Sequence, residues 1–295
     1  MELTIGPLQF NWPADAWSDF YARVADEAPV DRVVIGELVC SKRLPFYVDR
    51  IPAAIERLER AGKKVVLASL ALVTLPRERR AAAGFFGDDG PEIEINDLTL
   101  MRWADGSQPF SIGPLVNVYN EGTLRFLACK GARSVCLPPE LPFASVAVLA
   151  EAARAASIRC EVWAFGRAPL AISGRCYHAR VHGLAKDSCQ FVCDRDPDGL
   201  VVETLDKQAF LTVNGVQTLS FNCVNLVGDV DQLAAAGVSA LRLSPHGDDF
   251  VGVTRIFRAV IDGAESGEAA GAALAALIPP MPFSRGFMFG TTGAE

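Results

Sequence analysis

The sequence predicts an α/β protein built as a (β/α) TIM-like barrel, and three observations support that fold class. Short β-branched runs alternate with segments that carry apolar residues at helical spacing. The links between them are short and often contain Gly or Pro, which favours parallel strands joined by crossover helices. Half of the residues are hydrophobic, enough to fill a large core. Seven or eight such units would close into a barrel, although it could be irregular or incomplete.

Most of the chain follows this alternation in order. The first predicted helix shows it well, since Trp17, Tyr21 and Val24 recur on one face. Gly62 ends the second helix, as glycine often does. The predicted strands are 3–5, 32–36, 63–68, 92–95, 110–118, 134–137, 159–164, 209–213 and 240–244, and the predicted helices are 14–28, 46–61, 76–83, 98–104, 121–130, 143–156 and 252–264.

The domain organisation follows from the same pattern. We assign residues 1–264 to the barrel domain, with a polar, cysteine-bearing loop at about 174–195. Residues 265–295 are rich in Ala, Gly and Pro and are predicted to lie over the surface as a C-terminal extension. No internal repeat or low-complexity tract interrupts the chain.

Composition excludes several classes of function. The formal net charge is −7 and no dense basic block is present, so nucleic acid is a poor candidate partner. Residues 1–17 lack the basic flank and apolar run of a secretory signal. The longest apolar segments, 65–75 and 269–278, are too short to span about 30 Å of hydrocarbon. We therefore expect a soluble cytoplasmic protein, in which eight cysteines favour metal or redox chemistry over disulfides.

The cysteines are concentrated on one polar segment. Cys176, Cys189 and Cys193 lie among basic and polar residues, which is not the environment of a buried core. Three thiols on such a segment are typical of ligands for a soft metal centre, and a [4Fe–4S] cluster normally takes four. Cys40 follows the predicted strand 32–36, at the rim of a barrel where the cysteine loop would also lie. The fold thus gives a physical route by which Cys40 can meet the other three thiols at an iron–sulfur cluster.

Other interpretations of the cysteines remain open. Their spacing does not match the paired Cys-x-x-Cys units of zinc fingers, and free cysteines often pack in cores. A packing role is the simpler interpretation for Cys129, on a predicted helix, and for Cys136 and Cys160, in predicted strands. Cys223 follows a strand-like run and has polar neighbours, so it is a rival for the fourth ligand.

Histidines and basic residues accompany the cysteines. His178 and His182 are one helical turn apart and could present two imidazoles to zinc. A third ligand and the Glu of a His-Glu-x-x-His pattern are missing, so polar loop residues are the simpler interpretation. The nearby basic residues could offset the charge of a thiolate-ligated cluster or be ordinary solvated charges; they are Lys42, Arg43, Arg175 and Arg180.

Several motifs together resemble one family. They are Gly6-Pro7, Ile35-Gly36-Glu37-x-x-Cys40-Ser41-Lys42-Arg43, Asn117-x-Tyr119-Asn120, Leu137-Pro138-x-Glu140-Leu141, Gly174-Arg175-Cys176-x-x-Ala179-Arg180, Asn214-Gly215-x-Gln217-Thr218 and Arg242-Leu243-Ser244-Pro245. With these motifs the chain resembles the UbiV family, iron–sulfur proteins of anaerobic ubiquinone biosynthesis that are similar to the collagenase-like peptidases. The resemblance spans nearly the whole chain, and the segments around Cys40 and Cys176 are its most specific parts.

The resemblance has implications for fold, cofactor and partners. It implies a (β/α) barrel and a [4Fe–4S] cluster on Cys40, Cys176, Cys189 and Cys193. It implies a heterodimer with a homologous UbiU-like subunit, and a UbiT-like lipid carrier in the same pathway. The pair would hydroxylate the ring of a quinone precursor without oxygen, with prephenate as the oxygen donor.

Two departures from the family pattern qualify these implications. The tail, 284–289, reads Ser-Arg-Gly-Phe-Met-Phe, where the family often ends in an Asn-Gly-Tyr-Trp-like motif. Contacts made by that motif are therefore not implied here. Cys223 stands where the resemblance does not require a ligand, which leaves the fourth ligand open.

Two further functions compete with a redox subunit. A hydrolase could use Cys40 and His178 as a dyad, but this leaves the other thiols unexplained. A cluster could also serve only to stabilise the fold. No catalytic step is assigned to the polar residues expected near strand ends, which are Glu37, Asn117, Tyr119, Asn120, Glu140 and Arg242.

Overall fold

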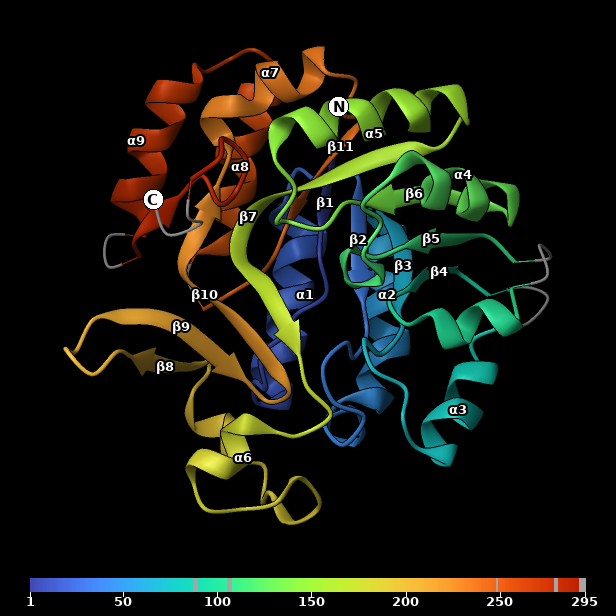
Figure 1. Cartoon of the computed structure of the whole chain (residues 1–295), viewed down its shortest axis with the longest axis vertical. Coiled ribbons are helices and arrows are strands. Elements are labelled where there is room, and N and C mark those ends of the chain that lie inside the picture. Colours follow the sequence, from blue (N-terminus) through green and yellow to red (C-terminus); the bar gives the residue numbers. More distant parts are fainter. Residues whose placement is uncertain (87–89, 105–107, 248, 279–280, 292–295) are drawn as a thin grey trace.

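The computed structural model (Figure 1) describes residues 1–86, 90–104, 108–247, 249–278 and 281–291. Within these ranges, eight parallel strands form a barrel: β1 (Glu2–Ile5), β2 (Arg32–Ile35), β3 (Lys64–Ala68), β4 (Glu92–Ile95), β5 (Phe110–Ile112), β6 (Ala132–Cys136), β7 (Arg159–Ile172) and β11 (Ala240–Leu243). Each strand pairs with the next, and β11 pairs with both β1 and β7, which closes the ring. The predicted fold class is confirmed, and the barrel is complete.

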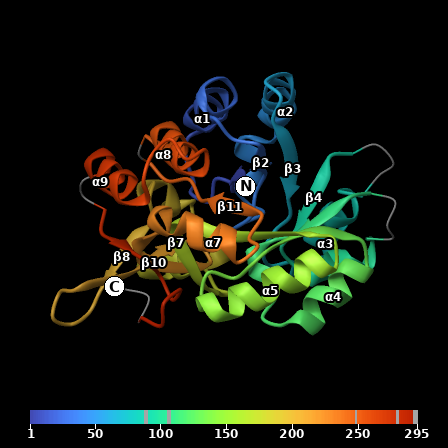
Figure 2. The ribbon, with the colours of Figure 1, turned by 90° about the horizontal axis from the view of Figure 1, so that it is seen from above.

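Helices surround this barrel, as the view from above shows (Figure 2). They are α1 (Ala14–Glu27), α2 (Ile51–Arg60), α3 (Pro76–Ala83), α4 (Glu121–Cys129), α5 (Phe143–Ala155), α7 (Val230–Ala235) and α8 (Phe250–Ile261). α1 buries Trp17, Tyr21 and Val24, the face that the sequence predicts. Among the described residues, no helix combines the length and the apolar character needed to cross a membrane.

Short 3₁₀ turns replace regular structure at several predicted elements. The predicted strand 110–118 ends at Ile112, because Gly113 and Pro114 follow and proline has no N–H for a sheet ladder. The predicted helix 98–104 is a 3₁₀ turn, Leu98–Arg102. The other such turns are Leu44–Phe46, Val48–Arg50, Pro114–Val116, Lys186–Ser188, Val192–Arg195 and Val227–Asp229.

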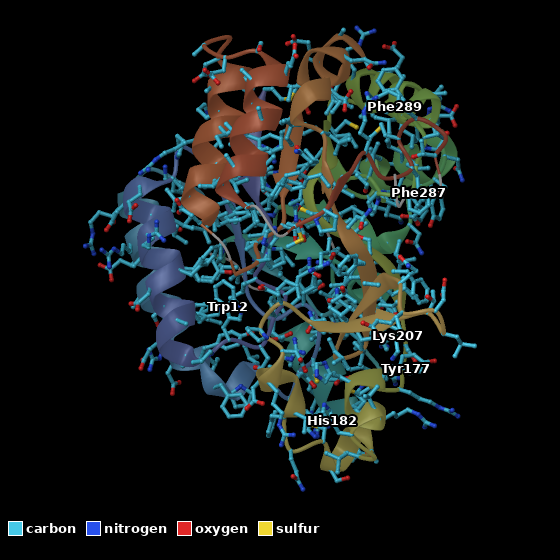
Figure 3. All side chains as sticks on the ribbon, turned by 90° about the vertical axis from the view of Figure 1, so that its left-hand side faces the viewer. Trp12, Tyr177, His182, Lys207, Phe287 and Phe289 are labelled. Atoms are coloured by element: carbon cyan, nitrogen blue, oxygen red, sulfur yellow. The ribbon has the colours of Figure 1, made fainter. Side chains whose placement is uncertain are left out.

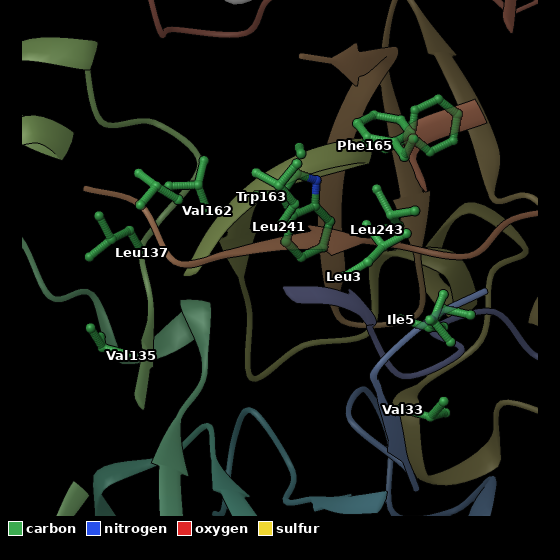
Figure 4. Packing of buried hydrophobic residues seen from close by; sticks show 14 of the residues in the cluster. Leu3, Ile5, Val33, Val135, Leu137, Val162, Trp163, Phe165, Leu241 and Leu243 are labelled. Carbon is green, nitrogen blue, oxygen red and sulfur yellow. The ribbon is translucent and has the colours of Figure 1, made fainter. Parts of the chain in front are cut away.

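The main core lies between the barrel wall and the helices (Figure 4). Alternate residues of each strand point to opposite faces, so Leu3, Ile5 and Val33 face this layer from neighbouring strands. Leu241 and Leu243 continue it across the closing strand. All five are fully buried, which makes this layer the principal hydrophobic contribution to stability.

The barrel interior, in contrast, is strongly polar. Arg242 of β11 reaches Glu94 of β4 at 2.5 Å and Glu161 of β7 at 2.6 Å. Nearer the start of the strands, Arg32 binds Glu92 at 2.8 Å. Because β4 and β11 lie on opposite sides of the ring, Arg242 and Glu94 meet across the interior and tie the wall together.

An insertion between β7 and β11 departs from regular β/α alternation. β7 runs on past the barrel and pairs antiparallel with β10 (Gln217–Asn225), which is followed in the sheet by β9 (Ala209–Asn214) and β8 (Leu200–Glu203). The predicted strand 209–213 therefore exists but lies outside the barrel. A two-residue hairpin loop that starts at Gly215, with φ +61°, explains this, since such loops join antiparallel strands.

The C-terminal segment is part of the folded body. α9 (Gly267–Leu277), beyond the last predicted helix, packs against α8 and buries Ala270 and Leu274. β12 (Phe283–Ser284) pairs with β10. The tail then returns to α5, where the ring of Phe289 stacks on Phe143 (Figure 3). The division into a barrel domain and a C-terminal extension stays a prediction.

Candidate functional site

The four predicted ligands line one small cavity. Cys40 belongs to the segment after β2, and Cys176, Cys189 and Cys193 belong to the segment after β7. Both segments lie at the lower end of the molecule in Figure 1, beyond the C-terminal ends of the barrel strands. Cys40 therefore lies on the same side of the molecule as the other three cysteines, as the prediction requires. That these cysteines hold a metal remains a prediction.

A buried carboxylate shapes the turn that carries Cys40. Glu37 Oε1 accepts hydrogen bonds from the backbone N–H groups of Val39, at 2.7 Å, and Cys40, at 2.8 Å. The Tyr47 hydroxyl donates to Glu37 Oε2 at 2.6 Å, and the Tyr47 ring stacks on Trp17 of α1 at 4.9 Å. Burial, together with the Glu37 charge, raises the pKa of Tyr47 well above its usual value. Tyr47 therefore stays a donor and fixes the carboxylate that holds this turn.

Gly36 makes the exit from β2 possible. Its φ is +131°, a conformation that side-chain-bearing residues rarely adopt. A Cβ at this position would also lie 3.1 Å from the carbonyl oxygen of Ala68 on β3. The glycine of the Ile35-Gly36-Glu37 motif thus lets the chain leave the barrel wall toward Cys40.

Each of the four sulfur atoms faces an N–H group. Cys176 Sγ accepts from the Ala179 backbone N–H at 3.4 Å, at the start of α6 (Tyr177–Val181). The backbone N–H of Lys42 lowers the pKa of Cys40, although burial, the larger effect, raises it. Burial also raises the pKa of Cys176, and the neighbouring thiols add to this. Without a metal these two groups are therefore neutral thiols; metal binding would displace their protons.

The other two sulfurs are reached by side chains from distant segments. Lys42 Nζ lies 3.3 Å from Cys189 Sγ and also donates to the carbonyls of Lys186 and Asp187. Asn11 Nδ2 donates to Cys193 Sγ at 3.4 Å. Trp12, labelled in Figure 3, donates to the Pro197 carbonyl just beyond. The N-terminal half of the chain thus holds the cysteine segment at several points.

Backbone strain is concentrated between Cys189 and Cys193. Gln190 and Phe191 have φ values of +51° and +55°, which non-glycine residues seldom adopt. The Phe191 ring lies 4.7 Å from Phe46, edge to face. Strained residues of this kind cluster at ligand clamps and functional sites. The turn brings both thiols to the cavity at the cost of an unfavourable backbone.

The basic residues near the cysteines differ in their environments. Arg43 is fully buried and donates to the Gln9 carbonyl at 2.8 Å and to Asn214 Oδ1 at 2.9 Å. Burial lowers its pKa, but Glu37 and the neighbouring thiols outweigh this and raise it, so Arg43 is charged. Of the four basic residues singled out in the sequence, Arg43 and Lys42 line the cavity, as does Lys186, so these three residues can offset its charge. Arg175 and Arg180 are exposed and do not line it.

The structure adds Asp196 to the histidine pair. His178 is fully buried and its Nε2 lies 2.8 Å from Asp196 Oδ2; the ring of His182 lies 5.9 Å from that of His178. Possible ligand atoms of these three residues lie within 4.8 Å of one another, so the third ligand missing from the sequence pattern is present. Burial, only partly opposed by Asp196, lowers the pKa of His178. The His178–Asp196 contact also joins the two ends of the cysteine segment.

Asp196 was missed because its partner is 18 residues away and on a different turn. Its place three residues after Cys193 was the available signal. Figure 3 labels Tyr177 and His182 on this segment, at the opposite end of the molecule from Phe287 and Phe289.

The remaining cysteines lie elsewhere. Cys223 is buried in β10 with its sulfur 3.8 Å from His246 Nε2, and it does not line the cavity. The structure therefore does not favour Cys223 as the fourth ligand. Cys136 and Cys160 are buried in strands, and Cys129 is exposed at the end of α4. Burial is the main reason why the pKa of Cys136 is raised well above its usual value.

The polar residues expected at strand ends have separate roles. Glu37 holds the Cys40 turn, and Arg242 belongs to the barrel interior. Tyr119 donates a hydrogen bond to Glu140; its pKa is raised to about 12 by burial and by this carboxylate. Asn120 caps α4 by accepting from the Thr123 N–H. None of Asn117, Tyr119, Asn120 and Glu140 lines the cysteine cavity.

Fold and site together define a closed α/β barrel with a thiol-lined cavity between the segment after β2 and the insertion after β7. The sequence matches peptidase family U32 over residues 18–295, and the chain belongs to that family. The match covers nearly all of the chain, including all four cavity cysteines.

Two solved structures are similar at low identity. One is an uncharacterized B. cereus protein, with a TM-score of 0.43 and 12% identity over 84% of this chain. The chain spans 62% of the length of that protein. The other is the U32 peptidase Mk0906, with a TM-score of 0.47 and 12% identity; 84% of this chain and 94% of that one are covered.

Proposed function

We propose that this chain is the [4Fe–4S] subunit of an oxygen-independent ring hydroxylase in ubiquinone biosynthesis. The observation that carries the proposal is the cavity lined by Cys40, Cys176, Cys189 and Cys193, whose sulfurs all face N–H donors. Four thiolates are the usual ligands of such a cluster, and hydrogen bonds to sulfur tune its potential. The reaction and pathway come from the resemblance to the UbiV family.

The donor set fits the cluster chemically. Soft thiolates select iron–sulfur centres or zinc, and no carboxylate is among the residues that line this cavity. Lys42 and buried Arg43 supply positive charge beside the negative charge that four thiolates bring. We therefore assign Cys40, Cys176, Cys189 and Cys193 as the ligands and an iron–sulfur cluster as the cofactor.

The bound cluster would supply electron transfer. The surrounding residues position it and control its environment. Glu37 and Tyr47 hold the backbone of the Cys40 turn, while Lys42 fastens that turn to the segment with Cys189. Val192 and Val216, both buried, add apolar wall that limits access of water.

The partners are inferred from the resemblance alone. We propose a heterodimer with a homologous UbiU-like subunit and cooperation with a UbiT-like lipid carrier in the cytoplasm. A quinone precursor and prephenate would be the small molecules of the reaction. An enzyme of this kind needs both subunits, so we assign no catalytic residue to this chain.

A hydrolase is the second candidate, favoured by the family name and by Cys40 and His178 lining one cavity. The electrostatics oppose it. A nucleophilic cysteine needs a lowered pKa and a basic imidazole, whereas burial raises the pKa of Cys40 and lowers that of His178. Cleavage of a peptide by metal-free protein would support this candidate.

Anaerobic purification tests the cluster directly. We expect about four iron and four sulfide per chain, with iron–sulfur absorbance and a paramagnetic resonance signal after reduction. Replacing all four cavity cysteines with Ser should remove iron and sulfide, while Cys129→Ser, at an exposed position outside the cavity, should keep both. Full iron and sulfide in the fourfold variant would refute the ligand set.

The same fourfold variant distinguishes a purely structural cluster from a redox centre. If the cluster only stabilises the fold, the fourfold variant should lose folding or association with the UbiU-like subunit. If it is a redox centre, the variant should stay folded and associated, as circular dichroism and size-exclusion chromatography would show, while ring hydroxylation is lost.

A further inference from the structure

A second cavity lies on the other side of the Cys40 turn. It has a volume of about 370 Å³, within the range of small-molecule sites, and sits between the outer face of β2 and β3 and helix α3. Its walls are almost entirely hydrocarbon. The apolar side chains include Ile35, Leu67, Leu70, Val73, Phe85 and Leu100.

One turn forms a wall of both cavities. Glu37 and Ser41 line the apolar cavity, whereas Cys40, between them, lines the cysteine cavity. The Ser41 hydroxyl donates to Glu78 of α3 at 2.6 Å, so the turn is fastened to the far side of the apolar cavity. A molecule in this cavity would lie against the back of the turn that presents Cys40.

Both carboxylates that line the cavity, Glu37 and Glu78, are already hydrogen-bonded. Glu78 accepts from the backbone N–H groups of Thr74 and Leu75, both at 2.9 Å, as well as from Ser41. Burial opposes ionisation of Glu78, but these hydrogen bonds outweigh it and lower its pKa. Glu37 is held by its own donors, as described above. Two satisfied carboxylates repel an anion and have no need of a cation.

We propose that this cavity binds an uncharged, mainly hydrocarbon molecule that carries at most a hydroxyl group at the end nearest Ser41. The hydrocarbon walls supply affinity through burial of apolar surface. The hydroxyl oxygen of Ser41 can accept one more hydrogen bond, which suits an alcohol or a phenol. Arg77 also lines the cavity, but its side chain is exposed, so an anionic ligand is the alternative that the test must separate.

Three probes with the same eight-carbon chain test the class of ligand: 1-octanol, octanoate and octylamine. Isothermal titration calorimetry should show saturable binding of one octanol per chain, with octanoate and octylamine each at least about tenfold weaker. Equal or tighter binding of octanoate or octylamine would overturn the proposal. So would the absence of saturable octanol binding.

Plugging variants test the location. Ala81→Trp on α3 and Val48→Trp on the Val48–Arg50 turn each place an indole at an exposed lining position, from two different elements, where folding should stay intact. Both should reduce octanol affinity at least about tenfold, whereas Arg79→Trp, exposed on the same helix but outside the lining, should bind as the unsubstituted chain does. Unchanged binding in both plugged variants would place the ligand elsewhere.

The inference does not depend on the iron–sulfur proposal. Titrations of iron-free and iron-loaded protein should both show binding, because the cavity walls contain none of the four cysteines. Binding without iron would support this site even if the cluster proposal failed. If the protein binds iron but not octanol, the cluster proposal would remain and the proposal of an apolar ligand site would be refuted.

Discussion

The barrel interior and the cysteine cavity both bury groups that can carry charge, but they satisfy them differently. In the interior, carboxylates meet guanidinium groups directly: Arg242 binds Glu94 and Glu161, and Arg32 binds Glu92. In the cavity, the sulfurs receive hydrogen bonds, yet burial keeps the pKa of Cys40 raised. The interior therefore pairs its charged groups within the chain, although Arg242 Nε and Nη1 have no hydrogen-bond partner among the described residues. The cavity instead holds thiols, which bind a soft metal once they lose their protons.

This difference separates stability from binding. Changes in the interior should lower the free energy of unfolding and leave iron binding per folded chain unchanged. Changes around the cavity should lower iron retention and have smaller effects on the free energy of unfolding. Four substitutions, in order of expected effect on the free energy of unfolding, test the distinction.

Arg242→Leu should have the largest effect. It leaves the buried carboxylates of Glu94 and Glu161 without their cation, which costs about 3–5 kcal/mol in comparable buried pairs. Urea unfolding would measure the loss. Arg255→Leu, which removes an exposed ion pair to Glu27, should cost less than about 1 kcal/mol. Similar values for the two variants would show that the interior network does not hold the barrel together.

Acid should lower the free energy of unfolding by protonating Glu92 in the barrel interior. Burial opposes its ionisation, but Arg32 and Lys64 lower its pKa from 4.5 to about 2. Because the folded pKa is the lower one, the carboxylate contributes about 3 kcal/mol above pH 4.5, and this is lost as the pH falls toward 2. Unfolding measured at about pH 6 and about pH 3 should show a smaller acid loss for Glu92→Gln than for the unsubstituted chain.

Exposed Glu59→Gln serves as the control for the acid series. Its acid loss should equal that of the unsubstituted chain. An equally small acid loss in both variants would mean that Glu92 is not the group responsible.

Tyr47→Phe should affect both properties. It removes the donor to Glu37 and should cost about 1.5–3 kcal/mol, because hydrogen bonds to charged groups are worth about that much. The Cys40 turn would lose part of its support, so iron retention during dialysis against a chelator should fall. Tyr177→Phe, at an exposed site, should change neither value. Unaltered iron retention in Tyr47→Phe would show that Glu37 holds the turn without help.

Lys42→Met should have the smallest effect on stability and a clear one on iron. The expected stability change is below about 1 kcal/mol, because the lysine is partly exposed. Iron release to a chelator should quicken about threefold or more, since Cys189 loses its cation neighbour. Lys207→Met, on an exposed hairpin, is the control. A large stability loss with unchanged iron release would reverse the contrast between the two regions.

Much of the fold could be predicted because periodicity is a local property. α3 has the predicted bounds Pro76–Ala83, and α1 differs by one residue from the prediction. The three antiparallel strands of 200–225 were not recognised as an extension of the sheet, because pairing partners are not encoded in the local pattern. α9 was missed because its Ala-rich sequence shows only a weak apolar stripe.

The candidate site was likewise predictable only where the signal lies along the chain. Clustering along the chain was enough to single out Cys176, Cys189 and Cys193. The supporting roles of Glu37 and Asp196 were not predicted, since each depends on a turn whose geometry is set by neighbours elsewhere. The apolar cavity beside α3 could not be predicted from the sequence either, because a cavity arises from the space left between packed elements.

Residue order alone determined the barrel class and the chemical character of the cysteine segment, because strand and helix spacing and thiol composition can be read along the chain. The tertiary structure decided which residues meet: Cys40 with the segment after β7, Asn11 with Cys193, and Asp196 with His178. The physical reason is that these contacts join residues brought close only when the barrel closes and β7 extends beyond it.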